Sequence, residues 1–359
     1  MAKTMSDVLA HFPLETEPVP YGNGHINDTY TTQGTKRYIL QRINTKIFKD
    51  PYKLMENIVA VCDHVKAKVI AEGGDPDREA LTVIKTKSGK LCHTTAEGDV
   101  FRVYNFVENS LSYDVPESAE QLYHVGKAFG KFQRQLSDFP AETLVETIPD
   151  FHNTVKRVEN LKNAIKKDTV GRAANVQEEI EFALKYEHYA DLILKEIDKG
   201  TIPLRVTHND TKINNVLLDD KTGEGVCVID LDTVMPGSML NDFGDALRTG
   251  AATAAEDEED VSKMSFNLDC FYFFAKGFLE ETASTLTEKE IEYLPESALI
   301  LTYECGTRFL EDYLNGDTYF KVHKENHNLY RTRTQFKLVK DIEEKLPQMH
   351  EMIKKLLTE

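Results

Sequence analysis

The chain lacks several features that would assign it to a class at once. Its 359 residues contain no tryptophan, no Gly-Lys-Ser/Thr phosphate-binding loop, no Cys-x-x-Cys pair and no run of 18 apolar residues. These absences exclude a P-loop nucleotide site and argue against a membrane-spanning helix. The missing tryptophan also disfavours an aromatic cage for a quaternary ammonium group. The function must therefore be read from other motifs.

Basic residues are also scarce, with 43 Lys and Arg against 60 Asp and Glu, which gives a formal net charge of −17. Nucleic acids and anionic membranes are bound by basic surfaces, so neither is expected as a partner. A nucleotide needs only a few local cations and a metal ion, so ATP remains compatible with this charge. The sequence gives no basis for an oligomeric state.

Cysteine usage indicates the compartment. Five cysteines are scattered along the chain, odd in number, which predicts reduced and mostly buried thiols rather than disulfides. The first residues, Met1 to Phe12, contain no apolar run typical of a signal peptide. A cytoplasmic protein is therefore expected. The five are Cys62, Cys92, Cys227, Cys270 and Cys305.

One polar loop carries a set of residues suited to phosphoryl transfer. It reads Thr207-His208-Asn209-Asp210-Thr211-Lys212-Ile213-Asn214-Asn215 and follows a predicted strand. Transfer from ATP needs a residue that orients the acceptor hydroxyl and takes its proton, and it needs oxygen ligands for Mg²⁺. The pattern His-x-Asp-x4-Asn offers Asp210 as the base and Asn215 as a metal ligand.

A second carboxylate follows after a turn. Residues 219–225 are rich in Asp and Gly, so residues 216–218 and 226–229 are predicted to form a β-hairpin. This hairpin would bring Asp230 beside Asn215 as the second oxygen ligand. Each residue alone would be read as an ordinary loop or hairpin-end side chain, but the ordered set favours a kinase site.

The preceding residues predict a small sheet with one helix. Strands are expected near residues 18–21 and over 26–32, 37–43, 81–85, 90–94 and 100–107, after a short helix that ends before Pro13. Apolar residues spaced three or four apart from Leu54 to Val69 predict a helix between them. This is the outline of a kinase N-lobe, expected over residues 1–107.

A glycine-containing turn lies between the first two strands of that lobe. Gly22 and Gly24 would let the backbone fold close over phosphates in the first hairpin of an N-lobe, although Gly-x-Gly alone more often describes an ordinary hairpin turn. The last strand ends at a segment around Phe106 that leads into a helix. This segment is the expected hinge, and Phe106 the expected neighbour of an adenine ring.

The rest of the chain is expected to be mainly helical. Helices are predicted from about 117 and over 151–165, 176–199, 265–283, 288–314 and 334–357, so residues 108–359 would form one large lobe. The segment Asp242-Phe243-Gly244-Asp245 opens a further helix, and its acids are expected to brace the catalytic loop or cap that helix. The acidic run 256–260 is expected at another helix start. The predicted fold class is α+β and bilobal.

These motifs resemble one known group. The chain is similar to the aminoglycoside phosphotransferase and choline kinase branch of the protein-kinase-like superfamily, and within it to the N-acetylhexosamine 1-kinases. The resemblance covers nearly the whole length. It is carried by the loop 207–212 and by the segments Gly24-His25-Ile26-Asn27-Asp28-Thr29-Tyr30, Ile229-Asp230-Leu231-Asp232-Thr233 and Glu304-Cys305-Gly306-Thr307-Arg308. It implies Mg²⁺-dependent transfer of the γ-phosphate of ATP to the anomeric hydroxyl of N-acetylglucosamine or N-acetylgalactosamine, giving the α-1-phosphate.

The resemblance also implies roles for individual residues. Asp210 would be the base, Asn215 and Asp230 the metal ligands, and Lys212 would meet the γ-phosphate. Residues matching positions around the sugar are His25, Asn27, Arg308 and Tyr319. Without the resemblance, Arg308 would be read as a surface residue ion-paired with Glu304 and Asp312 at helical spacing.

One position departs from the wider superfamily. The strand over 37–43 should carry a lysine that meets the α- and β-phosphates, but it carries Gln41. Arg42 points to the opposite face of a strand and cannot replace it, and the helix glutamate Glu56 then has no partner. The N-acetylhexosamine 1-kinases share the glutamine, so Gln41 is expected to contact the nucleotide in its place.

Two alternatives stay open. The chain could be a kinase of the same superfamily that acts on an aminoglycoside, choline or another hydroxyl acceptor. It could also be a nucleotide-binding pseudokinase, for which Gln41 is the sole support. The sequence does not settle the preferred hexosamine, the need for its acetamido group or the preferred nucleotide.

Overall fold

The structure is a computed structural model that describes residues 2–22 and 26–358. Packing of the backbone divides the chain into two compact units. Unit 1 comprises Met1–Ser112, Gln135–Pro149 and Asn215–Pro236, and unit 2 comprises Tyr113–Arg134, Asp150–Asn214 and Gly237–Glu359. The fold is mixed α+β, with antiparallel strands in the N-terminal part and helices in the C-terminal part, as the sequence predicts. The assignment of ligands to residues 1–107 and 108–359 stays a prediction.

The main sheet of unit 1 is antiparallel, and its strand order is β1-β2-β3-β6-β4, with β5 also paired to β6. Each strand falls within or overlaps its predicted range. Gln41 is the direct partner of Arg102 across β3 and β6, so the two side chains lie on one face of the sheet. The strands are β1 (Val19–Pro20), β2 (Asp28–Thr31), β3 (Tyr38–Ile43), β4 (Val83–Ile84), β5 (His93–Thr94) and β6 (Val100–Asn105).

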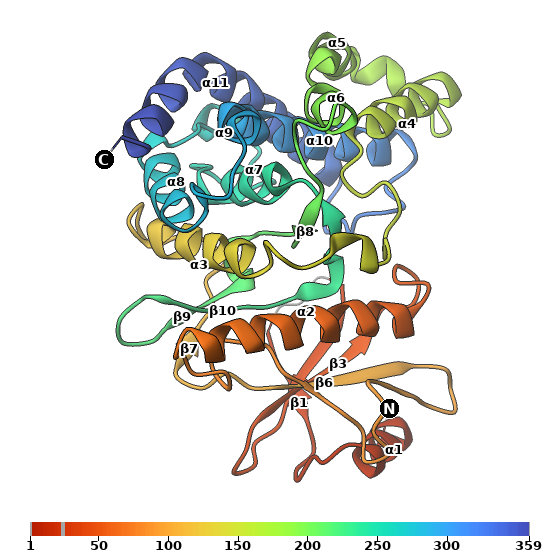
Figure 1. The fold of residues 1–359 in the computed structure, drawn as a ribbon. Helices are drawn as coiled ribbons and strands as arrows, with labels where there is room; N and C mark the ends of the chain where they lie inside the picture. Colours follow the sequence, from red (N-terminus) through yellow and green to blue (C-terminus); the bar gives the residue numbers. More distant parts are fainter. Residues whose placement is uncertain (1, 23–25, 359) are drawn as a thin grey trace. The chain divides into compact units, whose positions relative to one another are not determined.

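Two helices belong to this sheet (Figure 1). Helix α1 (Ala2–His11) packs Val8 and Phe12 against Leu40 and Val103 of β3 and β6. Helix α2 (Pro51–Ala71) begins at Asp50, whose side chain accepts the N–H of Lys53, and it buries the predicted stripe from Leu54 to Val69. Because side chains alternate along a strand, these two helices use opposite faces of β3 and β6.

A smaller sheet in unit 1 contains the predicted hairpin. Strands β9 (Val216–Asp219) and β10 (Gly225–Val228) pair antiparallel, and β7 (Ser110–Leu111) adds to the outer edge of β9. The carboxyl group of Asp219 accepts the N–H groups of Lys221 and Thr222, which closes the turn. The hairpin and its turn are therefore confirmed. The short strand β11 (Met235–Gly237) follows it.

Unit 2 is built from helices around one short strand, β8 (Arg205–Thr207). Helix α10 is central and packs against α4, α7 and α11 (Figure 1). Helices α3 and α8 cross closely, since a Cβ on Gly277 would lie 2.1 Å from the carbonyl oxygen of Tyr123. The helices are α3 (Gln121–Gln135), α4 (Thr154–Lys167), α5 (Gln177–Lys185), α6 (Leu192–Asp198), α7 (Met239–Gly250), α8 (Leu268–Thr282), α9 (Glu288–Glu292), α10 (Leu294–Leu314) and α11 (His327–Leu356).

Three helical predictions need correction. The segment 176–199 is two helices, and 288–314 is also two, because Pro295 lies in the first turn of α10, where its missing N–H is tolerated only at a helix start. The acidic run 256–260 does not begin an α-helix. It leads into a 3₁₀ turn, Val261–Lys263, which Asp260 caps by accepting the N–H of Ser262.

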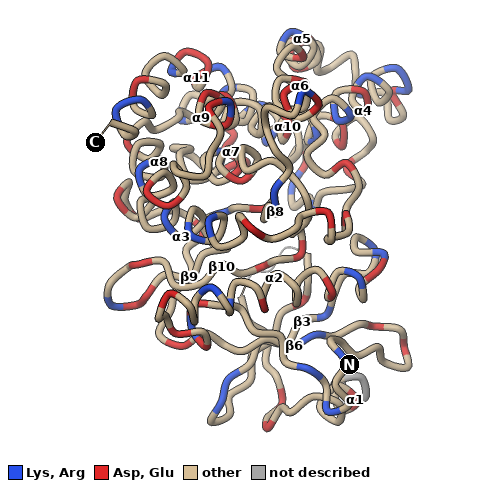
Figure 2. Tube along the Cα trace, viewed as in Figure 1, with Lys and Arg blue, Asp and Glu red and all other residues tan. Residues whose placement is uncertain are grey.

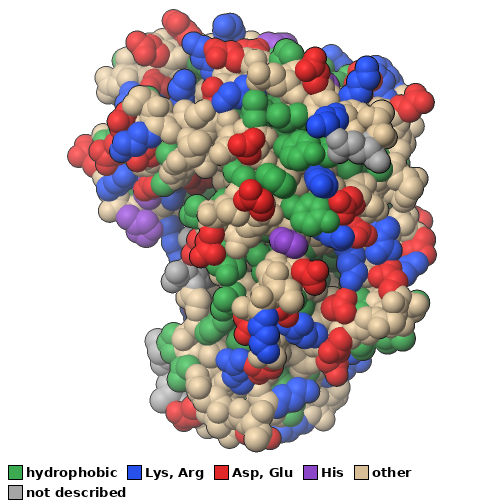
Figure 3. All heavy atoms as spheres, turned by 90° about the vertical axis from the view of Figure 1, so that its left-hand side faces the viewer, with side chains coloured by type: hydrophobic (Ala, Val, Ile, Leu, Met, Phe, Trp, Pro, Cys, Tyr) green, Lys and Arg blue, Asp and Glu red, His purple; other side chains and the backbone are tan. Residues whose placement is uncertain are grey.

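Charges of both signs occur throughout. Acidic residues are spread along the trace in Figure 2, and on the face drawn in Figure 3 they are interspersed with Lys and Arg. All five cysteines are free thiols and four of them are buried, as predicted. Within the described part of the chain, no helix combines the length and apolar character needed to cross a bilayer.

Candidate functional site: a kinase-type loop and a cationic cavity

The loop 207–214 in unit 2 is held by the first turn of α7. The two carboxylate oxygens of Asp242 accept the backbone N–H groups of His208 and Asn209 at 2.8 and 2.7 Å. The side-chain amide of Gln133 donates to the same carboxylate at 2.5 Å. Asn209 adopts a left-handed conformation (φ 64°), which asparagine tolerates better than most residues. The backbone of the loop is therefore fixed at His208 and Asn209.

A second carboxylate of α7 holds the middle of the loop. Asp245 accepts the N–H of Thr211 at 3.0 Å with one oxygen and Nε of Arg248 at 3.1 Å with the other. The hydroxyl of Thr211 donates to the carbonyl oxygen of Asp242 at 2.6 Å. The prediction that Asp242 and Asp245 brace the loop is confirmed, and Arg248 is an additional support that sequence reasoning missed.

Asp210 and Lys212 form an ion pair within the loop, with 2.8 Å between Nζ and Oδ1. Burial disfavours the charged carboxylate, but Lys212 outweighs burial and lowers the pKa of Asp210. The same partner, Asp210, raises the pKa of Lys212. Asp210 is therefore an ionised acceptor at neutral pH, and Lys212 is a fixed cation beside it.

His152 connects this loop to α10. One ring nitrogen lies 2.8 Å from Oε1 of Glu304 and the other 3.0 Å from the carbonyl oxygen of Asn209. Burial opposes a charged imidazole, but the Glu304 carboxylate more than offsets it and raises the pKa of His152. Two acceptors facing both nitrogens favour the imidazolium form, since both nitrogens then donate.

The two predicted metal ligands, Asn215 and Asp230, flank the hairpin of unit 1. The N–H of Ile229 donates to the carbonyl oxygen of Asn215 at 2.9 Å, and Val216 pairs with Val228. The backbones at Asn215 and Asp230 are therefore neighbours, as the hairpin prediction requires. Asp230 is exposed and left-handed (φ 60°), a conformation uncommon for residues other than glycine.

This pair fits a hard divalent cation. A carboxylate and a carboxamide oxygen are the ligand types that Mg²⁺ accepts, and Mg²⁺ completes its coordination with water and substrate phosphates. Asp230 is solvent-exposed, so its carboxylate can be reached by an ion. The chemistry of the donors is therefore compatible with magnesium, and the assignment itself stays a prediction.

The residues predicted near the nucleotide lie in unit 1. Gly22 has a positive φ of 69°, as expected of a glycine turn, while Gly24 and His25 lie outside the described residues. The ring of Phe106 is covered by the guanidinium of Arg37, whose Cζ lies 3.7 Å from the ring centroid. The backbone N–H of Phe106 also donates to the backbone carbonyl oxygen of Arg37. Its proximity to adenine is not tested and stays a prediction.

Gln41 and Asn27 both take part in a buried polar network. Oε1 of Gln41 accepts two N–H groups of Arg102, and Nδ2 of Asn27 donates to Asp232 at 2.6 Å. Oδ1 of Asn27 accepts the N–H of Asn44. Both ends of the Asn27 amide are thus occupied within the protein. The predicted contacts of these two residues with ligands stay predictions.

The predicted sugar residues Arg308 and Tyr319 lie together in unit 2, in a cavity of ≈ 240 Å³. The guanidinium of Arg308 lies over the rings of Phe151, Tyr319 and Phe320, at 5.5 to 5.8 Å from their centroids. A second arginine, Arg157, also lines the cavity. The complete lining is Arg157, Arg308, Glu311, Asp312, Asn315, Thr318, Tyr319 and Phe320.

The loop that carries Tyr319 is fixed by Asp312. Its carboxylate accepts the N–H groups of Thr318 and Tyr319 at 2.9 and 2.8 Å with one oxygen, and that of Phe320 at 3.0 Å with the other. Nδ2 of Asn328 on α11 donates to it at 2.9 Å. Asp312 thus holds the wall of the cavity, and its oxygens are engaged in doing so.

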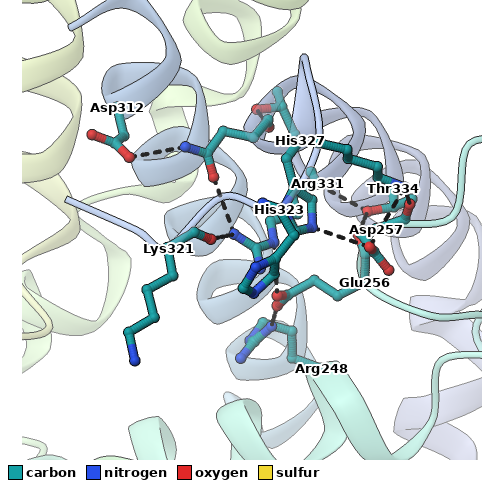
Figure 4. Close-up of polar contacts among 12 residues, drawn as sticks. Arg248, Glu256, Asp257, Asp312, Lys321, His323, His327, Arg331 and Thr334 are labelled. Atoms are coloured by element: carbon teal, nitrogen blue, oxygen red, sulfur yellow. Dashed lines mark hydrogen bonds and ion pairs between the residues drawn. The ribbon is translucent and has the colours of Figure 1, made fainter. Parts of the chain in front are cut away.

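The far end of the same loop is held by the acidic run. Glu256 accepts from Arg248 at 2.6 Å and lies 3.7 Å from Arg331, which donates to the carbonyl oxygen of Lys321 (Figure 4). Asp257 accepts from His327 at 3.0 Å. Two acids of the run that was predicted to begin a helix therefore support α11 and its preceding loop.

The surface reading of Arg308 does not hold. Glu304 is bonded to His152 and Thr154, and Asp312 to its loop. Within residues 2–22 and 26–358, Arg308 makes no hydrogen bond or ion pair. Burial works against its charge, yet Cys305 and the carboxylate of Glu304 raise its pKa, so it stays a cation. It can donate to a ligand in the cavity.

Sequence reasoning missed five supporting residues: Arg102, His152, Asp232, Arg248 and Asp312. For Arg102, His152 and Asp232 the side chain is buried or nearly buried and its partner lies far along the chain. A single arginine in the otherwise apolar strand 100–104 was the available signal for Arg102. For His152 and Asp232, spacing gave none.

The chain has the fold of protein-kinase-like kinases. Among solved structures, a microcompartment-associated aminopropanol kinase is similar at 13% identity, covering 98% of this chain and 99% of that chain, with a TM-score of 0.64. An aminoglycoside phosphotransferase from Alicyclobacillus acidocaldarius is 11% identical, with 97% of this chain and 95% of that chain covered and a TM-score of 0.64. A spectinomycin phosphotransferase bound to ADP and spectinomycin is 13% identical, with 97% of this chain and 98% of that chain covered and a TM-score of 0.59. At such identities these similarities show the fold.

The family follows from the sequence itself. Residues 17–269 match the model of the phosphotransferase enzyme family, which is more than half of the chain. The chain belongs to this family. The coarser part of the predicted resemblance, the aminoglycoside phosphotransferase and choline kinase-like superfamily, is therefore confirmed.

Proposed function

We propose that this chain is an ATP- and Mg²⁺-dependent kinase that phosphorylates the C1 hydroxyl of N-acetylglucosamine or N-acetylgalactosamine, giving the α-1-phosphate. The observation that carries the choice of acceptor is the cavity lined by Arg157 and Arg308. An ammonium group would meet two guanidinium cations there, whereas the hydroxyls and carbonyl of a neutral acetamido sugar can accept their hydrogen bonds. Tyr319, 61% exposed, offers a ring face to a sugar.

The charges of this cavity favour a neutral acceptor. Burial lowers the pKa of Arg157, and Arg308 lowers it further, so each cation disfavours additional positive charge. Nε of Arg157 is buried with no hydrogen-bond partner among the described residues. Of the two acids, Asp312 is engaged with the loop, and burial raises the pKa of Glu311. An amino alcohol would therefore bind less well than a neutral sugar.

The proposed chemistry uses the ion pair of the loop. Asp210 accepts a hydrogen bond from the C1 hydroxyl, aligns its oxygen with the γ-phosphate and takes its proton late in the transfer. Lys212 holds Asp210 in place and counters charge on the transferred group. Mg²⁺ on Asn215 and Asp230, when bound, neutralises phosphate charge.

The acceptor is tested by measuring ADP release with N-acetylglucosamine, N-acetylgalactosamine, glucosamine, ethanolamine and choline, followed by ³¹P and ¹H NMR of the product. We expect turnover with the two acetamido sugars and phosphate on C1. Glucosamine is the matched control, because it replaces the acetamido group with an ammonium group. Choline, ethanolamine or glucosamine as the sole good acceptor would contradict the proposal, and nucleotide binding without any turnover would favour a pseudokinase.

The base is tested by Asp210→Asn. Because the amide cannot accept the proton, we expect kcat to fall by about 10²–10⁴-fold. Asp138→Asn is the control, since this carboxylate pairs with Lys68 and His64 at the surface of unit 1. Unchanged turnover in the Asp210 variant would remove Asp210 from the mechanism.

A further inference from the structure

The guanidinium of Arg102 on β6 is a deeply buried charge of unit 1, and its side chain is 1% exposed. Its Nε and one terminal nitrogen donate to Oε1 of Gln41 at 3.0 and 2.8 Å. The other terminal nitrogen donates to Asp232 and lies 4.0 Å from Sδ of Met55 on α2. An ionised group removed from water needs such partners, so the Arg102 guanidinium depends on the Asp232 carboxylate for its burial.

Asp232 is bonded on every side. It is 4% exposed, its second carboxylate oxygen accepts from Asn27, and its backbone carbonyl accepts the hydroxyl of Thr147 at 3.2 Å. Two residues later, the carbonyl of Val234 accepts from Asn57 of α2 at 3.2 Å. The segment 231–234 is therefore fixed to the main sheet through Arg102 and to α2 through Asn57.

This segment begins directly after Asp230, the proposed metal ligand. Asp230 is left-handed (φ 60°), a conformation that Asp tolerates better than most residues, so the bonds on either side of it decide how firmly it is held. On its other side the chain is held by the hairpin bond between Ile229 and Asn215. Arg102, through Asp232, supplies the constraint that follows Asp230.

We propose that Arg102 is a positioning residue for the metal-binding carboxylate: it holds Asp232, and thereby fixes Asp230 in the conformation that binds the divalent cation of the nucleotide complex. This inference rests on the proposed function. It also gives Gln41 a role, because Gln41 orients Arg102 with its carbonyl oxygen and is itself held by Thr29 at 3.1 Å. The cation that β3 does not supply is then present on β6, as the direct cross-strand partner of Gln41.

Arg102 does not act as a contact to substrate in this proposal. Its donors face Gln41, Asp232 and Met55, and its side chain is enclosed between the sheet and α2. Residues behind the ligands of a metal typically change its affinity by roughly 10- to 100-fold when they are replaced. The readout is therefore metal affinity rather than turnover alone.

The experiment measures Mn²⁺ binding by electron paramagnetic resonance in the presence of AMP-PNP, with no acceptor. Four proteins are compared: wild type, Arg102→Met, the double variant Arg102→Met with Asp232→Leu, and a control. The double variant removes both charges, and replacing a buried ion pair with apolar residues commonly restores stability. It remains folded if the single variant does not.

We expect the Kd for Mn²⁺ to rise by about 10- to 100-fold in the single variant and in the double variant, although the thermal midpoint recovers in the double variant. If the Arg102–Asp232 pair served stability alone, the double variant would recover both the thermal midpoint and the wild-type affinity for Mn²⁺. Wild-type Mn²⁺ affinity in the stable double variant would overturn the inference.

The control is Arg205→Met with Glu290→Leu in unit 2. This pair is also buried, with side chains 14% and 0% exposed and two hydrogen bonds of 2.8 Å. We expect Mn²⁺ affinity to be unchanged, and an equal loss there would contradict a specific role of Arg102. If wild type itself bound no Mn²⁺ with AMP-PNP, the proposed function and this inference would fall together. If wild type binds Mn²⁺ and the Arg102 variants bind it equally well, the inference alone fails.

Discussion

Arg102 in unit 1 is a fully buried arginine, and Arg308 in unit 2 is a partly buried one with different surroundings. Arg102 donates to Gln41 and Asp232, while Arg308 lies over three aromatic rings and has no hydrogen bond or ion pair among the described residues. An arginine whose donors are satisfied fixes the structure around it. An arginine held by rings keeps its donors for a ligand. The pattern of partners separates a positioning role from a binding role.

The largest effect is expected on stability. Arg102→Met leaves the Asp232 carboxylate buried without its cation, which should lower the free energy of unfolding by about 3–5 kcal/mol. Arg308→Met removes no internal hydrogen bond or ion pair and should change it by less than about 1 kcal/mol. Urea unfolding of both variants measures this difference. Equal losses would show that the two arginines do not differ as their partners indicate.

The next effect is expected at Arg308 rather than at Arg102. Arg308→Gln should raise the KM for the acceptor by about 10- to 100-fold, since a hydrogen bond from a charged group contributes about 1.5–3 kcal/mol. The KM for ATP should stay unchanged. Steady-state kinetics with each substrate varied in turn measures both. Arg333→Gln is the control, because this arginine is 44% exposed and pairs with Glu179. A change confined to the KM for ATP would place Arg308 outside the acceptor site.

A smaller effect should follow from loosening the loop that faces Arg308. In Asp312→Asn the amide group turns donors toward the N–H groups of Thr318, Tyr319 or Phe320, at a cost of about 1–3 kcal/mol in stability. The KM for the acceptor should rise as Tyr319 moves. The neighbouring Glu311→Gln is the matched control, since Glu311 lines the same cavity without bonding the loop. It should leave stability unchanged, and equal unfolding curves for both variants would contradict the role of Asp312.

Local sequence signals were sufficient for the polar loop 207–214 and the hairpin. Asn209, Asp210 and Asn215 lie within one short polar stretch, and the Asp and Gly residues of 219–225 define the turn that returns the chain to Asp230. The stripe from Leu54 to Val69 likewise predicted α2 from its own spacing. Such features depend on residues close together in the chain, so periodicity and turn chemistry reveal them.

The supports of these elements could not be predicted in this way. Arg102 is separated by 130 residues from Asp232, and His152 by 152 residues from Glu304. Their burial results from the packing of distant segments, which no local pattern encodes. The acidic run 256–260 was misread for the same reason, because its partners Arg331 and His327 lie on α11. The preference of acids for a helix N-terminus predicted a helix there, whereas Glu256 and Asp257 pair with residues of α11 and Asp260 caps a 3₁₀ turn.

The smallest expected effect is a dependence on pH at His152, a third buried cation that lies between the two cases. Like Arg102, it is bonded to a carboxylate, and like Arg308 it lies in unit 2, but its charge can be lost. Its folded pKa is raised above the ordinary value near 6.5, with burial opposing and Glu304 prevailing. The stabilisation is therefore complete below the unfolded pKa and is lost as pH rises through the folded pKa. The slope is at most about 1.4 kcal/mol per pH unit.

Urea unfolding of wild type and His152→Gln from about pH 6 to about pH 9 measures this contribution as the difference between the two curves. We expect the variant to be less stable at the acidic end and the difference to shrink above the ordinary histidine range, because neutral imidazole can no longer donate to both Glu304 and the carbonyl of Asn209. Thr154→Val is the control, since it removes the other hydrogen bond to Glu304 without a titratable group. Its difference from wild type should be nearly independent of pH. A difference between wild type and His152→Gln that grows with rising pH would mean that His152 is neutral in the folded protein, and its ring could then donate to only one of Glu304 and the carbonyl oxygen of Asn209.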